Sequence, residues 1–385
     1  MEKEEQQAFA AAVLNKVSAK LNWVADKNYG RLPYTTDEEG NYIDKADPRV
    51  NYPADDGISW WTNGFFGGLM WLMYIETNDE KYLRTARKSE EQLDKCFALF
   101  YGLHHDVGFM YMPTAVMDYR LTGNEDGRKR GLHAATLLAG RYNPAGRFIR
   151  AWNENYGGDP TGRAIIDCLM NLSLLYWASD EIHDPRFREI AMNHADTAVK
   201  HFVRDDGSVK HIVDFDPETG CCLKDEGGQG YCRGSSWLRG QAWAVYGFTL
   251  SYLHSGREVY LETAEKVARY CIGNIPADGI LPLDFRQPAE PALEDSCGAA
   301  ILASGLLSLA AAVQGEKAEL YRAAGIRILT ALAEKRADYG HGCDAVIERC
   351  SAAYHDKKHH FPMIYADFFF TEALMKLKGN YRLVW

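Results

Sequence analysis

The sequence is organised by an internal repeat. An apolar stretch of helical length is followed by a short polar turn and then by a more charged, amphipathic stretch, and this unit recurs over residues 62–97, 112–140, 162–203, 235–272 and 294–334. Each unit predicts a helical hairpin that buries its apolar face only by packing against neighbours of the same kind. This repeat constrains the fold more than any other feature of the chain.

Two further stretches complete the pattern. Residues 6–23 carry apolar side chains at helical spacing but follow no apolar partner, and residues 365–377 form an apolar stretch that no amphipathic partner follows. Helices that are apolar all round belong inside a protein, and amphipathic ones belong outside. We therefore predict one all-α domain over residues 1–385, an (α/α)6 barrel of six helical hairpins whose first and last helices pair. An open α-solenoid is the alternative.

Two stretches depart from the helical pattern. Residues 28–57 are rich in Tyr, Pro, Asp and Gly, which predicts a long loop. Residues 205–215 alternate between polar and apolar side chains, which predicts a short strand pair or an extended loop. The third apolar helix is expected to begin near residues 162–163.

The composition excludes several classes of partner. The net charge of −10 leaves no electrostatic footprint for nucleic acid and no basic helix for a membrane surface. The longest run without a charge or a bulky polar group, residues 298–313, is shorter than the roughly 20 residues of a membrane span. Residues 1–7 are acidic and polar, unlike a secretory leader. The nine cysteines lack C-x-x-C spacing, so we expect reduced thiols in a cytoplasmic protein. We expect this protein to be a monomer or a weak homodimer.

Unusual polar residues recur where the predicted inner helices begin. In a ring of inner helices that run the same way, these positions meet at one end; they are Asn63, Asp106, Asp167, Arg239, Asp295 and Asp367. The loops at the same end add Trp60, Trp61, Trp152, His211 and Gln229. Helix N-termini carry partial positive charge, so this end favours an anionic ligand.

The aspartates admit two explanations. Capping of a helix is the main explanation for the presence of Asp295 and Asp367, and it is a partial explanation for Asn63. Asp167 is expected one turn inside an apolar helix, where capping explains less; it is either functional or paired with Arg163 or Arg239. Asp106 also stands in an apolar and aromatic run. Two carboxylates at one pocket suit general acid and base catalysis on sugars.

Residues 235–243 form the other dense motif. Trp237 and Trp243 offer flat faces for stacking, and Arg239 offers a fixed cation for a carboxylate. The alternative is a pair of core tryptophans beside an arginine that satisfies backbone carbonyls. His104 and His105 are adjacent and are not expected to face one metal, so we predict neither a metal nor a cofactor.

Four motifs together resemble a known family. They are HHDVGF at 104–109, IIDCL at 165–169, SWLRGQAW at 236–243 and Asp295-Ser296. They resemble the unsaturated glucuronyl hydrolases of glycoside hydrolase family 88, over nearly the whole chain. The related unsaturated rhamnogalacturonyl hydrolases are less similar.

The resemblance implies an (α/α)6 barrel that removes 4,5-unsaturated glucuronic acid from the non-reducing end of lyase-generated oligosaccharides by hydrating the C4=C5 bond. It implies Asp167 as the acid and base, and Asp106 as a second essential aspartate. We expect the charge of Asp106 to keep Asp167 protonated near neutral pH. The family positions that line the sugar pocket match Trp60, Asn63, Trp152, His211, Gln229, Trp237, Arg239 and Trp243.

Two other functions stay open on the residues alone. An amino-sugar epimerase of the same fold would use a histidine pair, for which His105 and His211 are the candidates. A non-catalytic barrel would bind an unsaturated sugar without turning it over.

Overall fold

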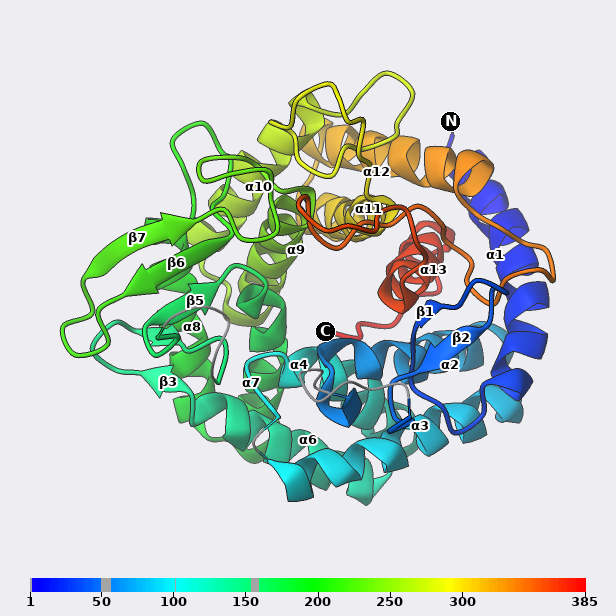
Figure 1. Cartoon of the computed structure of the whole chain (residues 1–385), viewed down its shortest axis with the longest axis horizontal. Helices are drawn as coiled ribbons and strands as arrows, with labels where there is room; N and C mark the ends of the chain where they lie inside the picture. The colour runs from blue at the N-terminus through cyan, green and yellow to red at the C-terminus, as the bar shows by residue number, and fades with distance from the viewer. Residues whose placement is uncertain (1, 50–56, 101, 154–158) are drawn as a thin grey trace.

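The helices form a closed double ring (Figure 1). The structure, a computed structural model, describes residues 2–49, 57–100, 102–153 and 159–385. Within these residues the inner helices are α2 (Gly64–Thr77), α4 (Val107–Tyr111), α5 (Met117–Thr122), α7 (Cys168–Ile182), α9 (Leu238–Ser255), α11 (Ser296–Ala312) and α13 (Ile364–Lys378). The outer helices are α1 (Lys3–Lys27), α3 (Glu80–Leu99), α6 (Glu125–Ala139), α8 (Pro185–His201), α10 (Glu258–Gly273) and α12 (Glu316–Lys335). A π-helical turn, Met112–Val116, joins α4 to α5 into one inner position.

The ring closes through contacts between consecutive inner helices. α2 packs against α13 and α4, α4 against α7, α7 against α9, α9 against α11, and α11 against α13. α1 packs against α13, so the first and last helices form the sixth pair. The (α/α)6 barrel predicted from the repeat is confirmed.

Burial separates the two layers as the sequence pattern predicts. Every residue of α11 from Ser296 to Leu307 is buried, whereas α3 buries residues such as Tyr82, Leu83 and Ala86 at helical spacing and exposes the rest. The inner helices also approach one another closely. A side chain at Gly64 would place its Cβ 2.4 Å from the carbonyl oxygen of Phe109, so glycine is required where α2 crosses α4.

The polar turns between paired helices combine two local signals. Asn78 ends α2 in the left-handed conformation, and the side chain of Asp79 then accepts a hydrogen bond from the backbone of Lys81 at the start of α3. His183 and Asp184 play the same two parts between α7 and α8. These turns are confirmed at the predicted positions.

Short strands occur in the predicted loop at 28–57 and next to the predicted start of the third inner helix. β1 (Pro33–Thr36) and β2 (Tyr42–Asp44) pair antiparallel within the predicted 28–57 loop, of which residues 50–56 lie outside the described residues. β5 (Arg163–Ile165), β6 (Ile212–Phe215) and β7 (Cys222–Glu226) form a sheet in that order.

These strands correct two expectations. The third inner helix begins at Cys168 rather than near residue 162, because residues 163–165 pair with β6. The extended segment predicted at 205–215 is confirmed for Ile212–Phe215, but its partners are β5 and β7 rather than a strand within the segment. A further small pair, β3 (Tyr142–Asn143) and β4 (Phe148–Ile149), follows α6.

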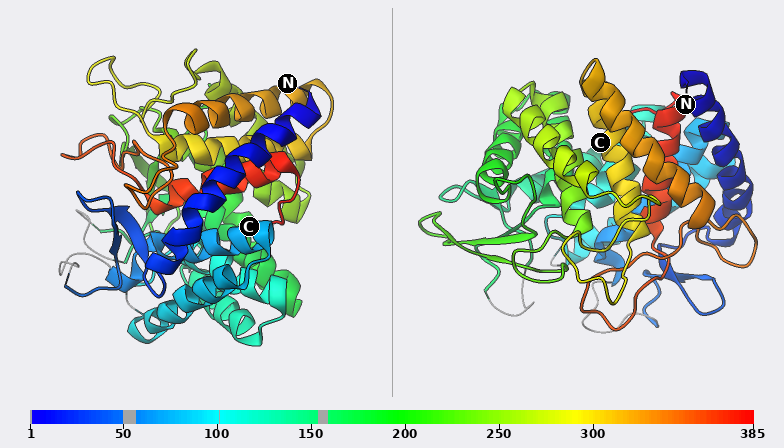
Figure 2. Two further views of the ribbon diagram at one scale, coloured as in Figure 1. Left: turned by 90° about the vertical axis from the view of Figure 1, so that its right-hand side faces the viewer. Right: turned by 90° about the horizontal axis from the view of Figure 1, so that it is seen from above.

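The strands and long connections gather at one end of the ring, where the inner helices begin (Figure 2). The last residue, Trp385, lies inside the ring (Figure 1), fully buried against the rings of Phe65, Phe109, Phe368 and Phe369. Among the described residues, no helix combines the length and the apolar character that crossing a membrane requires.

Candidate active site

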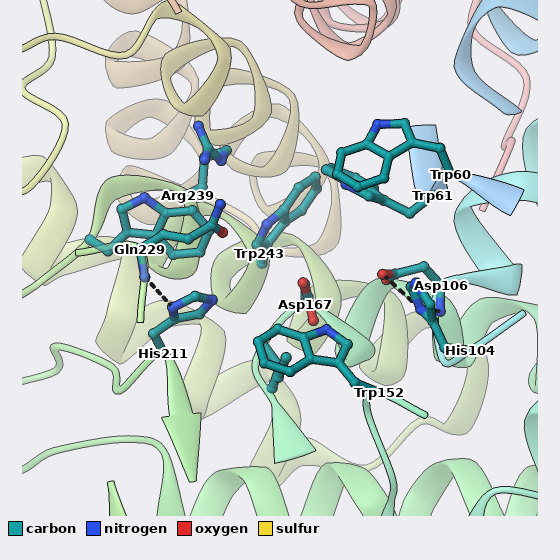
Figure 3. Close-up of a pocket in the computed structure, with 12 residues that line it drawn as sticks. Trp60, Trp61, His104, Asp106, Trp152, Asp167, His211, Gln229, Arg239 and Trp243 are labelled. Atoms are coloured by element: carbon teal, nitrogen blue, oxygen red, sulfur yellow. Dashed lines mark hydrogen bonds and ion pairs between the residues drawn. The ribbon is translucent and has the colours of Figure 1, made fainter. Parts of the chain in front are cut away.

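A cavity of about 250 Å³ opens at the end where the inner helices begin (Figure 3). Its lining residues are Trp60, Trp61, His104, Asp106, Trp152, Ile165, Asp167, His211, Gln229, Trp237, Arg239 and Trp243. The fold therefore brings together every predicted site residue except Asn63, although these residues are far apart in the sequence.

Asp106 is held rigidly at the start of α4. Its Oδ1 accepts a hydrogen bond of 3.0 Å from Nδ2 of Asn171 on α7, and its Oδ2 lies 3.3 Å from Nδ1 of His104 and 3.4 Å from Nε2 of His105. Gly108 permits this contact between helices, because a Cβ there would lie 2.5 Å from Oδ1 of Asn171. Asp106 is thus a well-supported carboxylate at the pocket wall.

Asp167 contrasts with Asp106 in how its side chain is supported. It directly precedes α7, one position outside the helix rather than one turn inside it as predicted, and its side chain does not cap the helix. Among the described residues Oδ1 accepts no hydrogen bond, and its ion-pair neighbour is Nε2 of His105 at 3.7 Å. The side chain is 20% exposed, enough for a ligand in the pocket to reach it.

The two arginines proposed as ion-pair partners of Asp167 are engaged elsewhere. Arg163 donates to both carboxylate oxygens of Asp214, at 2.8 and 2.9 Å, and Arg239 donates to Asp295 at 2.7 Å. The explanation of Asp167 as a member of a buried ion pair with either arginine is therefore wrong. What remains is a carboxyl group that faces the pocket without a counter-ion bonded to it.

Burial determines the protonation states in the pocket. It raises the pKa of Asp167 to about 7. Burial is the largest cause, whereas the prediction named the charge of Asp106. Burial also lowers the pKa of His104 and of His211 to about 3, and lowers that of His105 well below its usual value. The three imidazoles are therefore neutral at physiological pH, whereas Asp167 can gain or lose a proton there.

Arg239 combines the two roles that the sequence left open. It is buried, and its Nη1 donates to Oδ2 of Asp295 and, at 2.6 Å, to the carbonyl oxygen of Ser351, while Nη2 donates to the carbonyl oxygen of Ala352. Its guanidinium also lies 4.6 Å from the ring of Trp237 at the pocket. Although burial lowers it, the charge of Asp295 raises the pKa of Arg239 above its ordinary value. The pocket thus keeps a fixed cation.

The aromatic wall is built around His211 and Trp237. Their rings lie 4.2 Å apart, and Nδ1 of His211 accepts a 3.0 Å hydrogen bond from the backbone of Gln229. The Gln229 side chain donates to the carbonyl oxygen of Ala352 at 3.1 Å, and so joins the wall to the segment that Arg239 holds. Flat indole faces and a few polar groups in such a cleft suit a sugar ring.

The predicted set is wrong or incomplete at several positions. Asn63 is fully buried and donates to the carbonyl oxygens of Gly57 and Ile58, so it holds a turn outside the pocket. Asp367 lies inside α13 and accepts from Tyr42 and from the backbone of Val346 and Ile347, rather than capping the helix.

Other roles follow the prediction or extend it. Asp295 caps α11 as predicted, by accepting from the backbone of Cys297. The pocket also includes Trp61, which the sequence placed at this end of the ring, and His104 and Ile165, which the predicted set lacks. The neighbouring Asp106 is the signal that could have indicated His104.

One cluster has the composition of a metal site. Ligand atoms of His104, His105 and Asp106 lie within 4.8 Å of one another, so adjacent histidines do approach one carboxylate, contrary to the reasoning from sequence. The separations of 3.3 and 3.4 Å from Oδ2 of Asp106 are also those of polar contacts. We interpret the histidines as partners of the carboxylate.

Comparison with known proteins places this site in context. The sequence profile of Glycosyl Hydrolase Family 88 matches residues 34–324. The chain is 36% identical to an unsaturated glucuronyl hydrolase of Bacillus sp. (strain GL1), over 93% of this chain and 94% of that protein. It is 32% identical to an unsaturated chondroitin disaccharide hydrolase of Streptococcus pyogenes serotype M1, over 84% of this chain and 83% of the other.

The likeness extends to three dimensions. The solved structure of an unsaturated glucuronyl hydrolase from Streptococcus agalactiae matches with a TM-score of 0.89 at 28% identity, covering 98% of this chain and 94% of the other.

Proposed function

The chain belongs to glycoside hydrolase family 88, and on this basis we propose that it removes 4,5-unsaturated glucuronic acid from the non-reducing end of lyase-generated oligosaccharides. The observation that carries the proposal is the pairing of two unlike carboxyl groups at one pocket. Asp106 accepts a hydrogen bond from Asn171, whereas among the described residues Oδ1 of Asp167 accepts none, and burial raises the pKa of Asp167 to about 7.

The chemistry follows from the substrate's double bond. The C4=C5 bond is part of a vinyl ether, so protonation at C4 produces a cation at C5 that the ring oxygen stabilises. Asp167 donates this proton and then, as a carboxylate, accepts a proton from the water that adds to C5. The C5 hemiketal opens to a ketone, and the exposed hemiacetal at C1 releases the remaining sugar with the glycosidic oxygen.

The other pocket residues bind and orient the sugar. Asp106 accepts hydrogen bonds from ring hydroxyls, and the indole faces of Trp237 and Trp243 stack on the ring. Arg239 and the helix N-termini attract the uronate carboxylate. Trp60, Trp152, His211 and Gln229 complete the wall.

Incubation with unsaturated disaccharides tests the proposal. We expect loss of the alkene's ultraviolet absorbance, release of the second sugar, and, in deuterated water, early incorporation of deuterium at C4. Retained absorbance with release of the sugar would indicate direct glycosidic hydrolysis. Binding without turnover would indicate the non-catalytic barrel, and epimerisation without loss of the alkene would indicate the epimerase.

The proposed role of Asp167 predicts a pH dependence. Only the protonated acid can donate to C4, so the active fraction is highest below the pKa of about 7 and falls as the pH rises through it. We expect kcat/KM to decline about tenfold per pH unit on the alkaline side. Initial rates between about pH 5 and pH 9 measure this, with circular dichroism confirming the fold at each pH. A flat profile across neutral pH would contradict the role.

The preferred linkage is proposed from the relatives. One is named for chondroitin disaccharides and another for unsaturated glucuronyl groups in general. We therefore propose glycosaminoglycan fragments as the first substrates to test, with an unsaturated rhamnogalacturonan disaccharide as the comparison. A higher kcat/KM on the latter would reassign the substrate.

The surroundings of the enzyme are also part of the proposal. We place it in the cytoplasm as a monomer or weak homodimer. All nine cysteines are free thiols in the structure, which agrees with a reducing compartment.

A further inference from the structure

His105 lies behind both carboxylates and is wholly buried. Its Nε2 is 3.4 Å from Oδ2 of Asp106 and 3.7 Å from Oδ1 of Asp167. Neither ring nitrogen has a hydrogen-bond partner among the described residues. Buried polar atoms are normally paired, so an imidazole left this way between two functional carboxyl groups requires an explanation.

The surroundings of His105 keep its ring neutral. Several titratable and charged groups face the His105–Asp167 pair. They come from the loops before α4 and β6, from the turn between α6 and β3, and from helices α7, α8 and α9. These groups are His104, Asp106, Arg141, Cys168, His194, His211 and Arg239. Burial, together with His104 and Arg141, lowers the pKa of His105. A neutral imidazole carries one N–H, and at Nε2 that single donor faces two acceptors.

The two acceptors differ in their other support. Asp106 also receives a hydrogen bond from Asn171, whereas Oδ1 of Asp167 receives none. The shorter distance favours donation to Asp106 while Asp167 holds its proton. Once Asp167 has given that proton to the substrate, its new negative charge attracts the same N–H, and closing the 3.7 Å separation by a few tenths of an ångström completes a hydrogen bond.

We propose that His105 is a positioning residue whose neutral Nε2–H determines that Asp106 is the carboxylate and Asp167 the acid, and then stabilises Asp167 after proton transfer. The inference rests on the proposed function and assigns His105 no proton transfer of its own. Its interaction is stronger after Asp167 loses its proton than before, which is the condition for accelerating that step.

A matched pair of substitutions tests this role. The amide nitrogen of Gln reaches about as far as Nε2, whereas that of Asn reaches only as far as Nδ1, and neither amide titrates. We expect His105→Gln to keep kcat within about tenfold of the wild type and to leave the pH profile in place. We expect His105→Asn to lower kcat about 100-fold with little change in KM.

The pH profile separates positioning from packing. Loss of the donor destabilises the charged form of Asp167, so the alkaline limb of the kcat/KM profile should move to higher pH in His105→Asn. Melting temperatures of the two variants measure any loss of packing. Equal losses of kcat in both variants, with the alkaline limb undisplaced, would overturn the inference.

A second measurement does not depend on turnover. Carbon-13 NMR of aspartate carboxyl groups, with the Asp167 signal assigned from its absence in Asp167→Asn, reports the pKa of Asp167 directly. We expect an upward displacement of about one pH unit in His105→Asn and none in His105→Gln. An inactive wild type on every unsaturated disaccharide would refute the proposed function, whereas an undisplaced Asp167 signal would refute the role of His105.

Discussion

Replacing Asp167 with Asn is expected to reduce hydration of the unsaturated uronate by about 10³- to 10⁴-fold. The amide has nearly the same shape but holds no transferable proton, so the first step loses its acid and the second loses its base. The fold should tolerate the change, because the carboxylate caps no helix and Oδ1 accepts no hydrogen bond among the described residues. Loss of the alkene's ultraviolet absorbance measures the rate.

A matched control isolates the chemistry from the loss of one charge. Asp205→Asn, in an exposed turn away from the pocket residues, removes the same charge and should leave kcat and KM unchanged. If Asp167→Asn kept more than about a tenth of the activity while Asp106→Asn lost it, the roles of the two carboxyl groups would be reversed.

Replacing Trp385 with Ala is expected to lower the free energy of unfolding by about 3–5 kcal/mol. The indole is fully buried inside the ring and stacks on Phe369 at a centroid distance of 5.9 Å. Its Nε1 also donates to the buried Glu372 at 2.9 Å, so the substitution leaves both a cavity and a carboxylate with one donor fewer.

Denaturant unfolding followed by two probes measures this loss. Leu383→Ala is the control, because Leu383 lies two residues away but is 42% exposed, and its truncation should cost within about 0.5 kcal/mol. Similar losses for both variants would show that Trp385 is not part of the core.

Most of the helical architecture could be predicted from the sequence, because its signals are local. The predicted hairpin over 294–334 matches α11 and α12 closely: an uninterrupted apolar run makes one helix, Gly315 separates it from the next, and Asp295 caps its start. The errors lie where pairing is not local. β5 finds its partner about 50 residues away in β6, and no signal within residues 162–165 indicates it.

The site shows the same limit at the level of single residues. The sequence placed Asp106, Asp167 and Asn63 alike at the start of inner helices, and Asp106 and Asp167 do meet in one pocket. The same signal could not show that the side chain of Asn63 turns back to its own loop. The partner of Arg239 could not be predicted either, because Asp295 reaches it from 56 residues away in the sequence.

The support of Arg239 has a consequence for how relatives of this protein can diverge. Arg239 and Gln229 hold the neighbouring segment through the carbonyl oxygens of Ser351 and Ala352, and every amino acid supplies such an oxygen. The side chain at position 352 can therefore change without loosening the cation behind it. Evolution, or a mutant library confined to that position, can vary the half-buried side chain there while the contacts of Arg239 stay intact.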